Sequence, residues 1–346
     1  MRAYEIGDYA QSRKVRLVER ADPLPGAGEA LIRVRATGPN ARDFAIWTTG
    51  MLGSPGAPST FIPLCDVGAD VVAVGEGVNQ VVPGDRVTMI HYSRWLDGQW
   101  DVSMREEDFG CTRDGFLREL AVVPASALVR IPDSLSYEQA ATLPSAGLTS
   151  WQAVVEHGNL KAGDTMVTIG TGGVSVFAVQ WARMLGARVI VTSSSDDKLA
   201  RMRALGADDT INYRTTPQWS EAVMALTGGR GASLVINNVG LAEMDQCIEA
   251  CRSGARICYI GASPVTTDRV GLGGMVLRRF GQIIMRDLTI KGIVVGSRRM
   301  MVDVVKAMDE KGVRPVIDRV YEFEQANEAL EYFSNTGKIG KVVIRV

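Results

Sequence analysis

Alternation of apolar and polar residues marks the first part of the chain as rich in strands. Residues 30–36 (ALIRVRA) alternate as a strand with one buried face does. Two further apolar runs, at 71–74 and 85–90, are bounded by glycine and proline turns. Because no long helical period interrupts these runs, residues 1–130 are predicted to form a compact, mainly antiparallel β domain.

The pattern changes near residue 131, where strands begin to alternate with helices. Ser136 is predicted to cap a helix that runs to Leu143, and a second helix is predicted to start near Leu148. The strands predicted after it are 166–169, 188–192, 209–211, 233–237, 256–260 and 288–295. Six strands joined by crossover helices predict a doubly wound parallel sheet and an α/β fold class.

The last fifty residues do not continue this alternation. A helix after Ser297, a strand at 316–321, a helix at 324–333 and a strand at 341–346 are predicted there. These segments are expected to pack back on the first domain. The predicted domains are therefore 1–130 with 297–346, and 131–296.

A glycine-rich turn between a strand and a helix is the most informative local motif. The strand 166–169 runs into Gly170–Ser175 (GTGGVS), and an apolar helix follows to about Leu185. In such a turn the first glycine permits a tight bend, and the second lets backbone N–H groups approach a pyrophosphate at the helix N-terminus. Set between two strands, the motif favours dinucleotide binding over an ordinary strand–helix turn.

Composition narrows the class of protein further. The chain of 346 residues is 46% hydrophobic and 22% charged, which is typical of a globular protein of two domains. A net charge of −1 gives no electrostatic reason to bind nucleic acid or an anionic membrane. No apolar run of signal-peptide or membrane-span length occurs, and the five scattered cysteines indicate reduced thiols. A cytoplasmic protein with a small-molecule substrate is expected.

The chain resembles the medium-chain dehydrogenase/reductase superfamily over essentially its full length. The motifs that carry the resemblance are 25–30 (PGAGEA), 74–78 (VGEGV), 83–87 (PGDRV), 140–144 (AATLP) with Thr149, 170–175, 205–207 (LGA) with 211–213 (INY), and 340–343 (GKVV). Within that superfamily the chain is similar to zinc-independent quinone-oxidoreductase-like and alcohol-dehydrogenase-like members. The resemblance implies a GroES-like β domain and a Rossmann domain.

Zinc-dependent relatives place a Cys, a His and a later Cys or acid around a catalytic Zn²⁺. The matching positions here carry Asn40, Cys65 and Ser145. One soft ligand out of three cannot form a tetrahedral site with an open position. Cys247 and Cys251 lie four residues apart on a predicted helix, but core thiols are favoured there over metal ligands. No metal is predicted.

The residues after the second strand of the Rossmann unit favour NADP(H) over NAD(H). NAD-binding proteins usually place an acid ~20 residues after the glycines, where it holds the ribose 2′-hydroxyl. Here the run is Thr192–Ser195, although Asp196 and Asp197 follow closely. Ser193, Ser194, Lys198 and Tyr213 can form a cradle for a 2′-phosphate, and the similar quinone reductases use a Lys and a Tyr at the matching positions. A serine cap with a solvated Lys198, and a Tyr213 packed on the sheet, are the alternatives.

The residues predicted to contact the cofactor are Gly170, Thr171, Gly172, Gly173, Val174, Ser193, Ser194, Lys198, Tyr213, Asn238, Gly261, Val295, Gly296 and Ser297.

The resemblance also implies that Asn40 and Thr149 face the nicotinamide. The quinone reductases carry a Tyr five residues after the matching Asn, and this chain has Ala45 there. Replacement donors near these motifs are Arg42, Asp43, His91 and Tyr92, although a lone His is more often structural. The predicted catalytic residues are Asn40, Asp43, His91, Tyr92 and Thr149.

These features predict a zinc-independent, NADP(H)-dependent oxidoreductase that transfers hydride to an activated alkene, quinone or carbonyl. A zinc-free alcohol dehydrogenase and a cofactor-binding protein without turnover are the alternatives. The sixth Rossmann strand, 288–295, is apolar and would form a sheet edge. Because such edges are usually paired or covered, a homodimer through this strand is expected.

Overall fold

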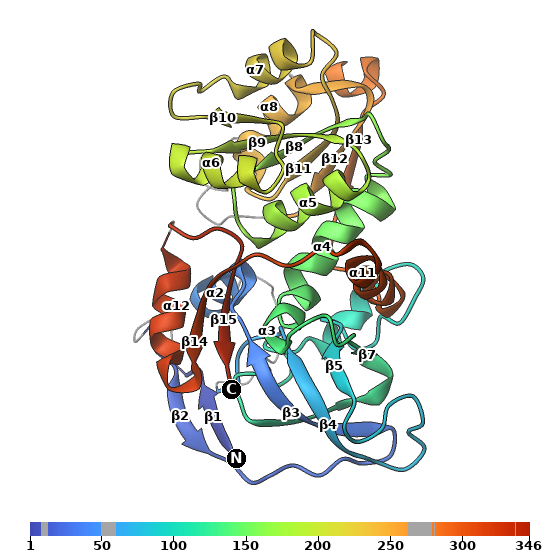
Figure 1. The fold of residues 1–346 in the computed structure, drawn as a ribbon, viewed down its shortest axis with the longest axis vertical. Coiled ribbons are helices and arrows are strands. Elements are labelled where there is room, and N and C mark those ends of the chain that lie inside the picture. Colours follow the sequence, from blue (N-terminus) through green and yellow to red (C-terminus); the bar gives the residue numbers. More distant parts are fainter. Residues whose placement is uncertain (8–12, 50–59, 262–278, 280, 336) are drawn as a thin grey trace. The chain divides into compact units, whose positions relative to one another are not determined.

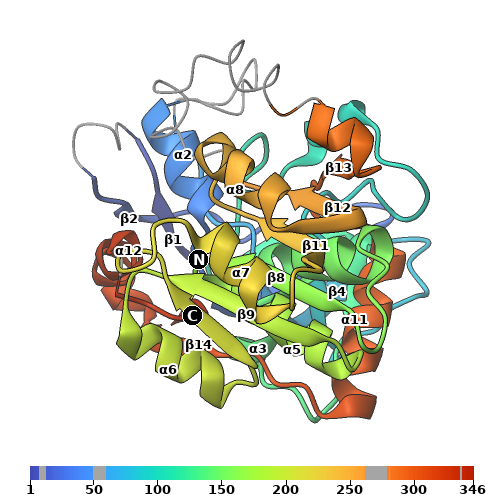
Figure 2. The ribbon, with the colours of Figure 1, turned by 90° about the horizontal axis from the view of Figure 1, so that it is seen from above.

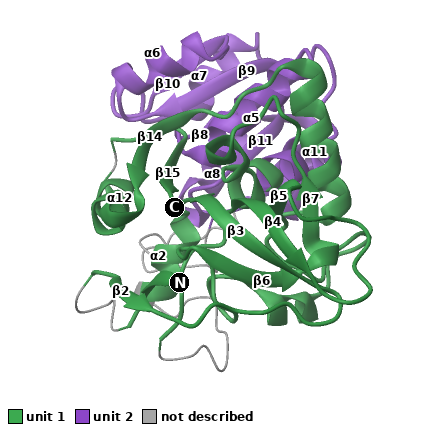
Figure 3. Ribbon diagram, turned by 60° about the horizontal axis from the view of Figure 1, so that its bottom comes forward, with its two compact units in different colours: residues 1–148, 295–346 green, residues 149–294 purple. Residues whose placement is uncertain are grey.

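The computed structural model describes residues 1–7, 13–49, 60–261, 279, 281–335 and 337–346. They form two compact units, one of residues 1–148 with 295–346 and one of residues 149–294 (Figure 3). Residues 131–148, which the sequence analysis grouped with the dinucleotide-binding domain, thus lie in the first unit. In the described part of the chain, every helix is too short or too polar to cross a membrane.

The first unit is built on a seven-stranded sheet (Figure 1). Its strand order is β14-β15-β3-β4-β5-β7, with β6 also paired to β3, and every pair is antiparallel apart from β14 and β15. The strands are β3 (Glu29–Thr37), β4 (Gly68–Val74), β5 (Arg86–Met89), β6 (Leu120–Pro124), β7 (Leu128–Arg130), β14 (Ile317–Glu322) and β15 (Lys341–Arg345). A separate hairpin pairs β1 (Arg2–Glu5) with β2 (Arg16–Glu19). Ile32 to Ala36 alternate between buried and exposed, as the sequence pattern predicted.

A helix interrupts this β domain, and the prediction of uninterrupted strands was wrong there. Helix α2 spans Ala41–Thr49. It starts where Oδ2 of Asp43 accepts the backbone N–H of Asn40 at 2.6 Å, which satisfies a donor at the helix end. Trp47 packs into the core, and Phe44 stacks on Phe333 with ring centroids 5.4 Å apart. A local cap and two aromatic residues fix this helix, and its apolar stripe is too short to identify from periodicity.

The remaining helices of the first unit pack around its sheet. Helix α3 (Tyr137–Ala140) begins at Ser136, which forms a capping box with Gln139, so the predicted cap is confirmed. Helical turns then cover 143–157, and α4 (Leu148–Trp151) among them carries the chain from the first unit into the second at Thr149. Helices α11 (Arg298–Lys311) and α12 (Ala326–Ser334) precede β14 and β15, respectively. Because β15 pairs with β3, the C-terminal segment completes the sheet of the first unit.

The second unit is a six-stranded parallel sheet with helices on both faces (Figures 1 and 2). Its strand order is β10-β9-β8-β11-β12-β13. The strands are β8 (Thr165–Ile169), β9 (Arg188–Ser193), β10 (Asp209–Asn212), β11 (Ala232–Asn237), β12 (Cys251–Tyr259) and β13 (Thr289–Gly292). Helices α5 (Gly173–Met184) and α6 (Asp196–Ala204) cover one face, and α7 (Trp219–Leu226) and α8 (Met244–Glu249) cover the other. The predicted α/β fold class, with a mainly antiparallel domain and a doubly wound sheet, is confirmed.

One detail of the predicted second unit was wrong. Cys247 lies on α8, but Cys251 is the first residue of β12, so the two do not share a helix face. Both thiols are buried, and burial raises the pKa of Cys251 to about 12. Thiols held in this protonated form pack as small apolar groups.

Candidate active site

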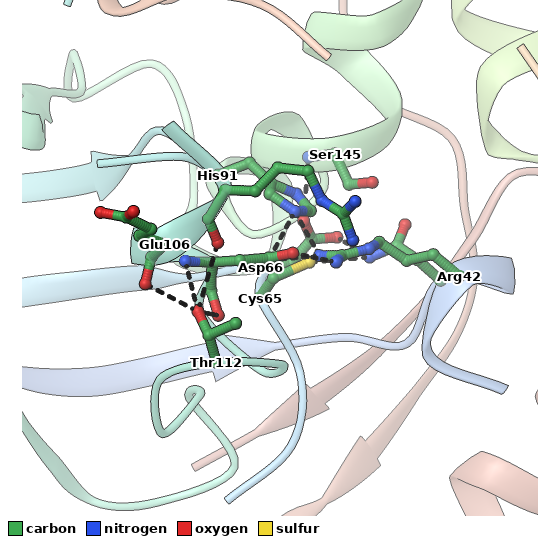
Figure 4. Close-up of polar contacts among 10 residues, drawn as sticks. Arg42, Cys65, Asp66, His91, Glu106, Thr112 and Ser145 are labelled. Atoms are coloured by element: carbon green, nitrogen blue, oxygen red, sulfur yellow. Dashed lines mark hydrogen bonds and ion pairs between the residues drawn. The ribbon is translucent and has the colours of Figure 1, made fainter. Parts of the chain in front are cut away.

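A buried carboxylate, Asp66, joins the three positions at which zinc-dependent relatives carry their ligands. Asp66 follows Cys65 just before β4 and is fully buried. The backbone N–H of Ser145 donates to its Oδ1 at 3.0 Å, and Nδ2 of Asn40 donates to its Oδ2 at 2.9 Å. Nδ2 of Asn40 also lies 3.8 Å from Sγ of Cys65. The fold therefore gathers Asn40, Cys65 and Ser145 around one carboxylate, and Figure 4 labels Cys65, Asp66 and Ser145 of this group.

Lys341, the first residue of β15, supplies the charge that balances Asp66. Its Nζ donates to Oδ2 of Asp66 at 2.8 Å, to Oδ1 of Asn40 at 2.7 Å and to the carbonyl of Pro39 at 2.9 Å. These contacts use all three N–H bonds of the ammonium, and the side chain is only 2% exposed. Sequence reasoning missed Lys341 as a site residue. The sequence feature that could have indicated Lys341 is a lysine directly after Gly340, at the start of a strand whose next three residues are apolar.

These contacts already engage polar atoms at the positions that match the zinc ligands of zinc-dependent relatives. Burial, together with the carboxylates of Asp43 and Asp66, raises the pKa of the Cys65 thiol well above its usual range. Oδ1 of Asn40 already accepts from an ammonium, whose charge would repel a cation. Across the described residues, no three His, Cys, Asp or Glu side chains are grouped for metal binding.

A second buried network connects α2 to the segments that contain His91, after β5, and Asp108. Nη1 and Nη2 of Arg42 donate to the two carboxylate oxygens of Asp108 at 2.9 and 2.6 Å. Such a bidentate pair is both strong and directional. Burial acts to raise the pKa of Asp108, but the positive charge of Arg42 outweighs it and helps to lower that pKa to about 2. Asp108 is therefore ionised at neutral pH.

His91 is fully buried beside this ion pair (Figure 4). Burial and the charge of Arg42 lower the pKa of His91, so its ring is neutral at neutral pH. An Arg42 N–H group points at Nε2, which also lies 3.1 Å from Oδ1 of Asp108. Since an arginine can only donate, Nε2 accepts and the ring proton lies on Nδ1. Nδ1 has no hydrogen-bond partner within the described residues.

Tyr92 is the other predicted donor in this part of the first unit. Its ring packs against His91 and Trp100, with centroids 4.4 and 4.7 Å away. Burial raises the pKa of Tyr92 to about 12, so the phenol keeps its proton at neutral pH. Its hydroxyl makes no hydrogen bond to any residue that the structure describes.

The remaining two predicted catalytic residues have different surroundings. Asp43 is fully buried, and burial raises its pKa from 3.8 to about 7. Its Oδ2 holds the start of α2, whereas its Oδ1 has no partner among the described residues. Thr149 lies on α4 as the first residue of the second unit, where it is buried.

The glycine turn has the geometry that a pyrophosphate site requires. Gly170 has a φ of +85°, which favours glycine, and its N–H donates to the carbonyl of Thr192 at 2.8 Å. Gly172 caps α5 in an extended conformation, and Thr171 between them is buried. Gly173 and Val174 form the first turn of α5. A Cβ atom added at Gly170 or Gly172 would meet nothing within 4 Å, so space is open beside the turn.

Ser175 fixes the turn to the neighbouring strand ends. Its Oγ donates to the carbonyl of Ile169 at 3.1 Å and accepts from Nδ2 of Asn238 at 2.7 Å. Asn238 directly follows β11. A Cβ atom at Gly261 would lie 2.1 Å from the carbonyl oxygen of Asn238, so only glycine fits there. Asn238 and Gly261 therefore meet at the carboxyl edge of the sheet, beside the glycine turn.

The predicted phosphate cradle lies at the carboxyl ends of β9 and β10. Ser193 ends β9, and its carbonyl accepts the backbone N–H of Tyr213 at 3.0 Å. Lys198 lies in the first turn of α6, whose N-cap is Ser195. Tyr213 is 38% exposed, and Ser194 lies between the strand and the cap. The structure thus places all four cradle residues around one end of two paired strands.

Val295, Gly296 and Ser297 belong to the first unit. All three are buried, and Ser297 caps α11. A Cβ atom at Gly296 would lie 2.6 Å from the Leu148 side chain, so this backbone is packed closely against the helical segment after α3.

Known proteins share this fold and much of this sequence. Residues 26–133 match the alcohol dehydrogenase GroES-like domain, and residues 173–310 match the zinc-binding dehydrogenase family. A zinc-type alcohol dehydrogenase-like protein of Schizosaccharomyces pombe is 39% identical over 324 residues, 92% of this chain and 91% of that protein. The acryloyl-coenzyme A reductase of Metallosphaera sedula is 28% identical over 99% of both chains. A solved NAD-dependent alcohol dehydrogenase is 32% identical, with a TM-score of 0.85 over 100% of both chains.

The chain belongs to the medium-chain dehydrogenase/reductase superfamily, as its sequence motifs indicated. It is an NAD(P)-dependent oxidoreductase.

Proposed function

We propose that this protein is a zinc-independent, NADP(H)-dependent oxidoreductase that reduces an activated alkene, a quinone or a carbonyl. The observation that carries the proposal is the buried network of Asp66, Lys341 and Asn40. It engages Asn40, one of the three positions that match the zinc ligands, with a carboxylate and an ammonium, so that the three groups already satisfy one another. Substrate activation therefore falls to hydrogen bonds and a proton donor of the chain itself.

Residues of the second unit suit a nicotinamide dinucleotide with a 2′-phosphate. The Gly170–Val174 turn would hold the pyrophosphate, and Ser193, Ser194, Lys198 and Tyr213 would hold the 2′-phosphate. When bound, the cofactor supplies the hydride. The relative named as NAD-dependent makes NAD(H) the competing choice.

The choice of cofactor can be tested by binding. The wild-type protein is expected to bind NADPH at least tenfold more tightly than NADH, a difference of about 1.4 kcal/mol. Lys198→Ala should weaken NADPH binding about tenfold and leave NADH binding unchanged, because only the 2′-phosphate loses a charged partner. Isothermal titration calorimetry measures both affinities, with Lys161→Ala as the matched control on the same unit. Equal affinities of the wild-type protein for the two cofactors would contradict the proposal.

Tyr92 is proposed as the proton donor of the reduction. Hydride adds to the substrate carbon, and the phenol of Tyr92 gives its proton to the oxygen or carbon that becomes negative, after which solvent restores that proton. His91 is less suited, because its Nε2 accepts from Arg42 and holds no proton. Arg42 stabilises the phenolate that Tyr92 forms, since its positive charge acts to lower the pKa of Tyr92.

Tyr92→Phe is expected to reduce kcat about 100-fold, the lower end of what general acid catalysis contributes. The affinity for NADPH should not change, because the variant removes one hydroxyl from the first unit only. Steady-state kinetics and cofactor titration separate these effects. Tyr137→Phe, which removes a hydroxyl bonded to Asp70 elsewhere in that unit, is the control. An unchanged kcat for Tyr92→Phe would exclude this role.

A substrate panel separates the proposed reaction from its alternatives. Enones, quinones and aldehydes with NADPH, and alcohols with NADP⁺, are followed through the absorbance of NADPH. Turnover only of alcohols would identify a zinc-free alcohol dehydrogenase. Tight binding of NADPH without turnover of any compound would instead indicate a cofactor-binding protein that is not catalytic.

The protein is further proposed to be a homodimer through β13. This strand ends the parallel sheet, and all four of its residues are exposed. The unpaired N–H and C=O groups of an edge strand can pair with those of a second copy, and Ile290 adds an exposed apolar side chain to this edge. Light scattering should give twice the chain mass for the wild-type protein and the chain mass for Ile290→Lys. Val320→Lys, a similarly exposed apolar position on β14, is the control, and a monomeric wild-type protein would rule the dimer out.

A further inference from the structure

Two carboxylates stand directly after the phosphate cradle. Asp196 and Asp197 open α6, three and four residues after Ser193 at the end of β9. An acid at this end of the second strand is the group with which dinucleotide-binding proteins hold the ribose 2′-hydroxyl, and its charge repels a 2′-phosphate. A protein that prefers NADP(H) must therefore keep such a carboxylate from the ribose.

Asn212 makes the contact that engages Asp196. Nδ2 of Asn212 donates to Oδ1 of Asp196 at 2.9 Å. Oδ1 of Asn212 accepts the backbone N–H of Arg214 at 3.0 Å, so the amide has one orientation, with its donor toward Asp196. Asn212 ends β10 opposite Ser193 of β9, and its carbonyl accepts the backbone N–H of Thr216 at 2.8 Å. The amide is thus held from both sides, next to the strand end that forms the cradle.

We infer that Asn212 is a specificity-determining residue that holds the Asp196 carboxylate on the β10 side of the cradle. In this position the carboxylate does not accept a ribose 2′-hydroxyl, and it does not oppose a 2′-phosphate at Ser193, Ser194 and Lys198. Asp197 has the same charge on the same helical turn, but Asn212 does not bind it. The inference rests on the proposed preference for NADP(H), which it explains at a residue outside the cradle.

The test compares the ratio of NADH to NADPH dissociation constants in a set of variants, measured by calorimetry. Asn212→Ala should lower the NADPH preference about tenfold, because the hydrogen bond from Nδ2 of Asn212 no longer restrains Asp196. Asn212→Ala combined with Asp196→Ala should restore the wild-type preference or exceed it. Asn212→Ala combined with Asp197→Ala should keep the lowered preference, and this double variant is the matched control for charge.

Each outcome decides a separate point. A wild-type protein without cofactor preference contradicts the proposed function itself. A clear wild-type preference that survives Asn212→Ala overturns the role of Asn212 alone. If Asn212→Ala lowers the NADPH preference by the same factor when residue 196 is already alanine, the role of Asn212 is also overturned. The altered turn at 212–216 would then cause the loss of preference. Thermal unfolding of every variant identifies any that fail to fold. If Asp196→Ala fails to fold, Asp196→Asn replaces it, because the asparagine keeps a carbonyl oxygen that can accept from Asn212.

Discussion

Replacement of Lys341 by Met is expected to lower the free energy of unfolding by about 3–5 kcal/mol. The variant leaves the carboxylate of Asp66 buried without a counter-charge, because Lys341 is its ion-pair partner at 2.8 Å and Asp66 is 0% exposed. The methionine chain has nearly the length of the lysine chain, so little packing is lost. Urea denaturation at neutral pH gives the change in the free energy of unfolding directly.

A second variant separates loss of the ion pair from loss of packing. Asp66→Asn combined with Lys341→Met removes both charges and should recover most of the lost stability. Lys306→Met is the control, because its partner Glu310 is 3.8 Å away and both side chains are mostly exposed. A cost below about 1 kcal/mol for Lys341→Met, the range of exposed ion pairs, would show that Asp66 does not depend on this ammonium.

Asp43→Asn is expected to change how stability depends on pH. Burial raises the pKa of Asp43 from 3.8 in an exposed chain to about 7 in the folded protein. The folded state therefore holds the proton more strongly than the unfolded state. Asp43 contributes stability that is fully present below about pH 4 and is lost as the pH rises through about 7. About three pKa units correspond to roughly 4 kcal/mol.

The stability of Asp43→Asn relative to the wild-type protein should thus rise by several kcal/mol between pH 4 and pH 9. The amide cannot ionise, and its oxygen can still accept the Asn40 N–H group at the start of α2. Unfolding in urea at a series of pH values measures the difference, in which the other titrating groups cancel. Asp108→Asn should show the opposite sign and in a lower pH range, because the pKa of Asp108 is lowered from 3.8 to about 2 and its contribution is lost only as the pH falls from about 4 towards 2. A difference that stays constant with pH would mean that Asp43 is ionised throughout.

Much of the second unit could be predicted because its order is local. The apolar strands β8 and β9, the glycine turn and the start of α5 follow one another within thirty residues, and each step has its own sequence pattern. The positive φ of Gly170 and the small Ser175 are properties of single positions that the motif specifies. Predictions of this kind need no knowledge of distant contacts.

The site of the first unit could be predicted only in part, because long-range pairing forms it. Sequence motifs pointed to Asn40, His91 and Tyr92, but not to the way in which their polar atoms are used. Lys341 binds Asp66 from 275 positions away, and Arg42 binds Asp108 from 66 positions away. Helix α2 was missed for a related reason, since a cap and packing on Phe333 establish it. Contacts of this kind form only when the chain has folded, and no periodic pattern of residues in the sequence indicates them.

The position of Lys341 also has a consequence for the order in which the protein can mature. The first unit is interrupted by the second, and the strand that carries Lys341 is synthesised after both. Until it pairs with β3, Asp66 has no counter-ion and the amide of Asn40 has no fixed direction. The dinucleotide-binding unit is already complete in the nascent chain at that stage. The chain therefore completes its dinucleotide-binding unit before β15 joins the sheet of the first unit and balances the charge of Asp66.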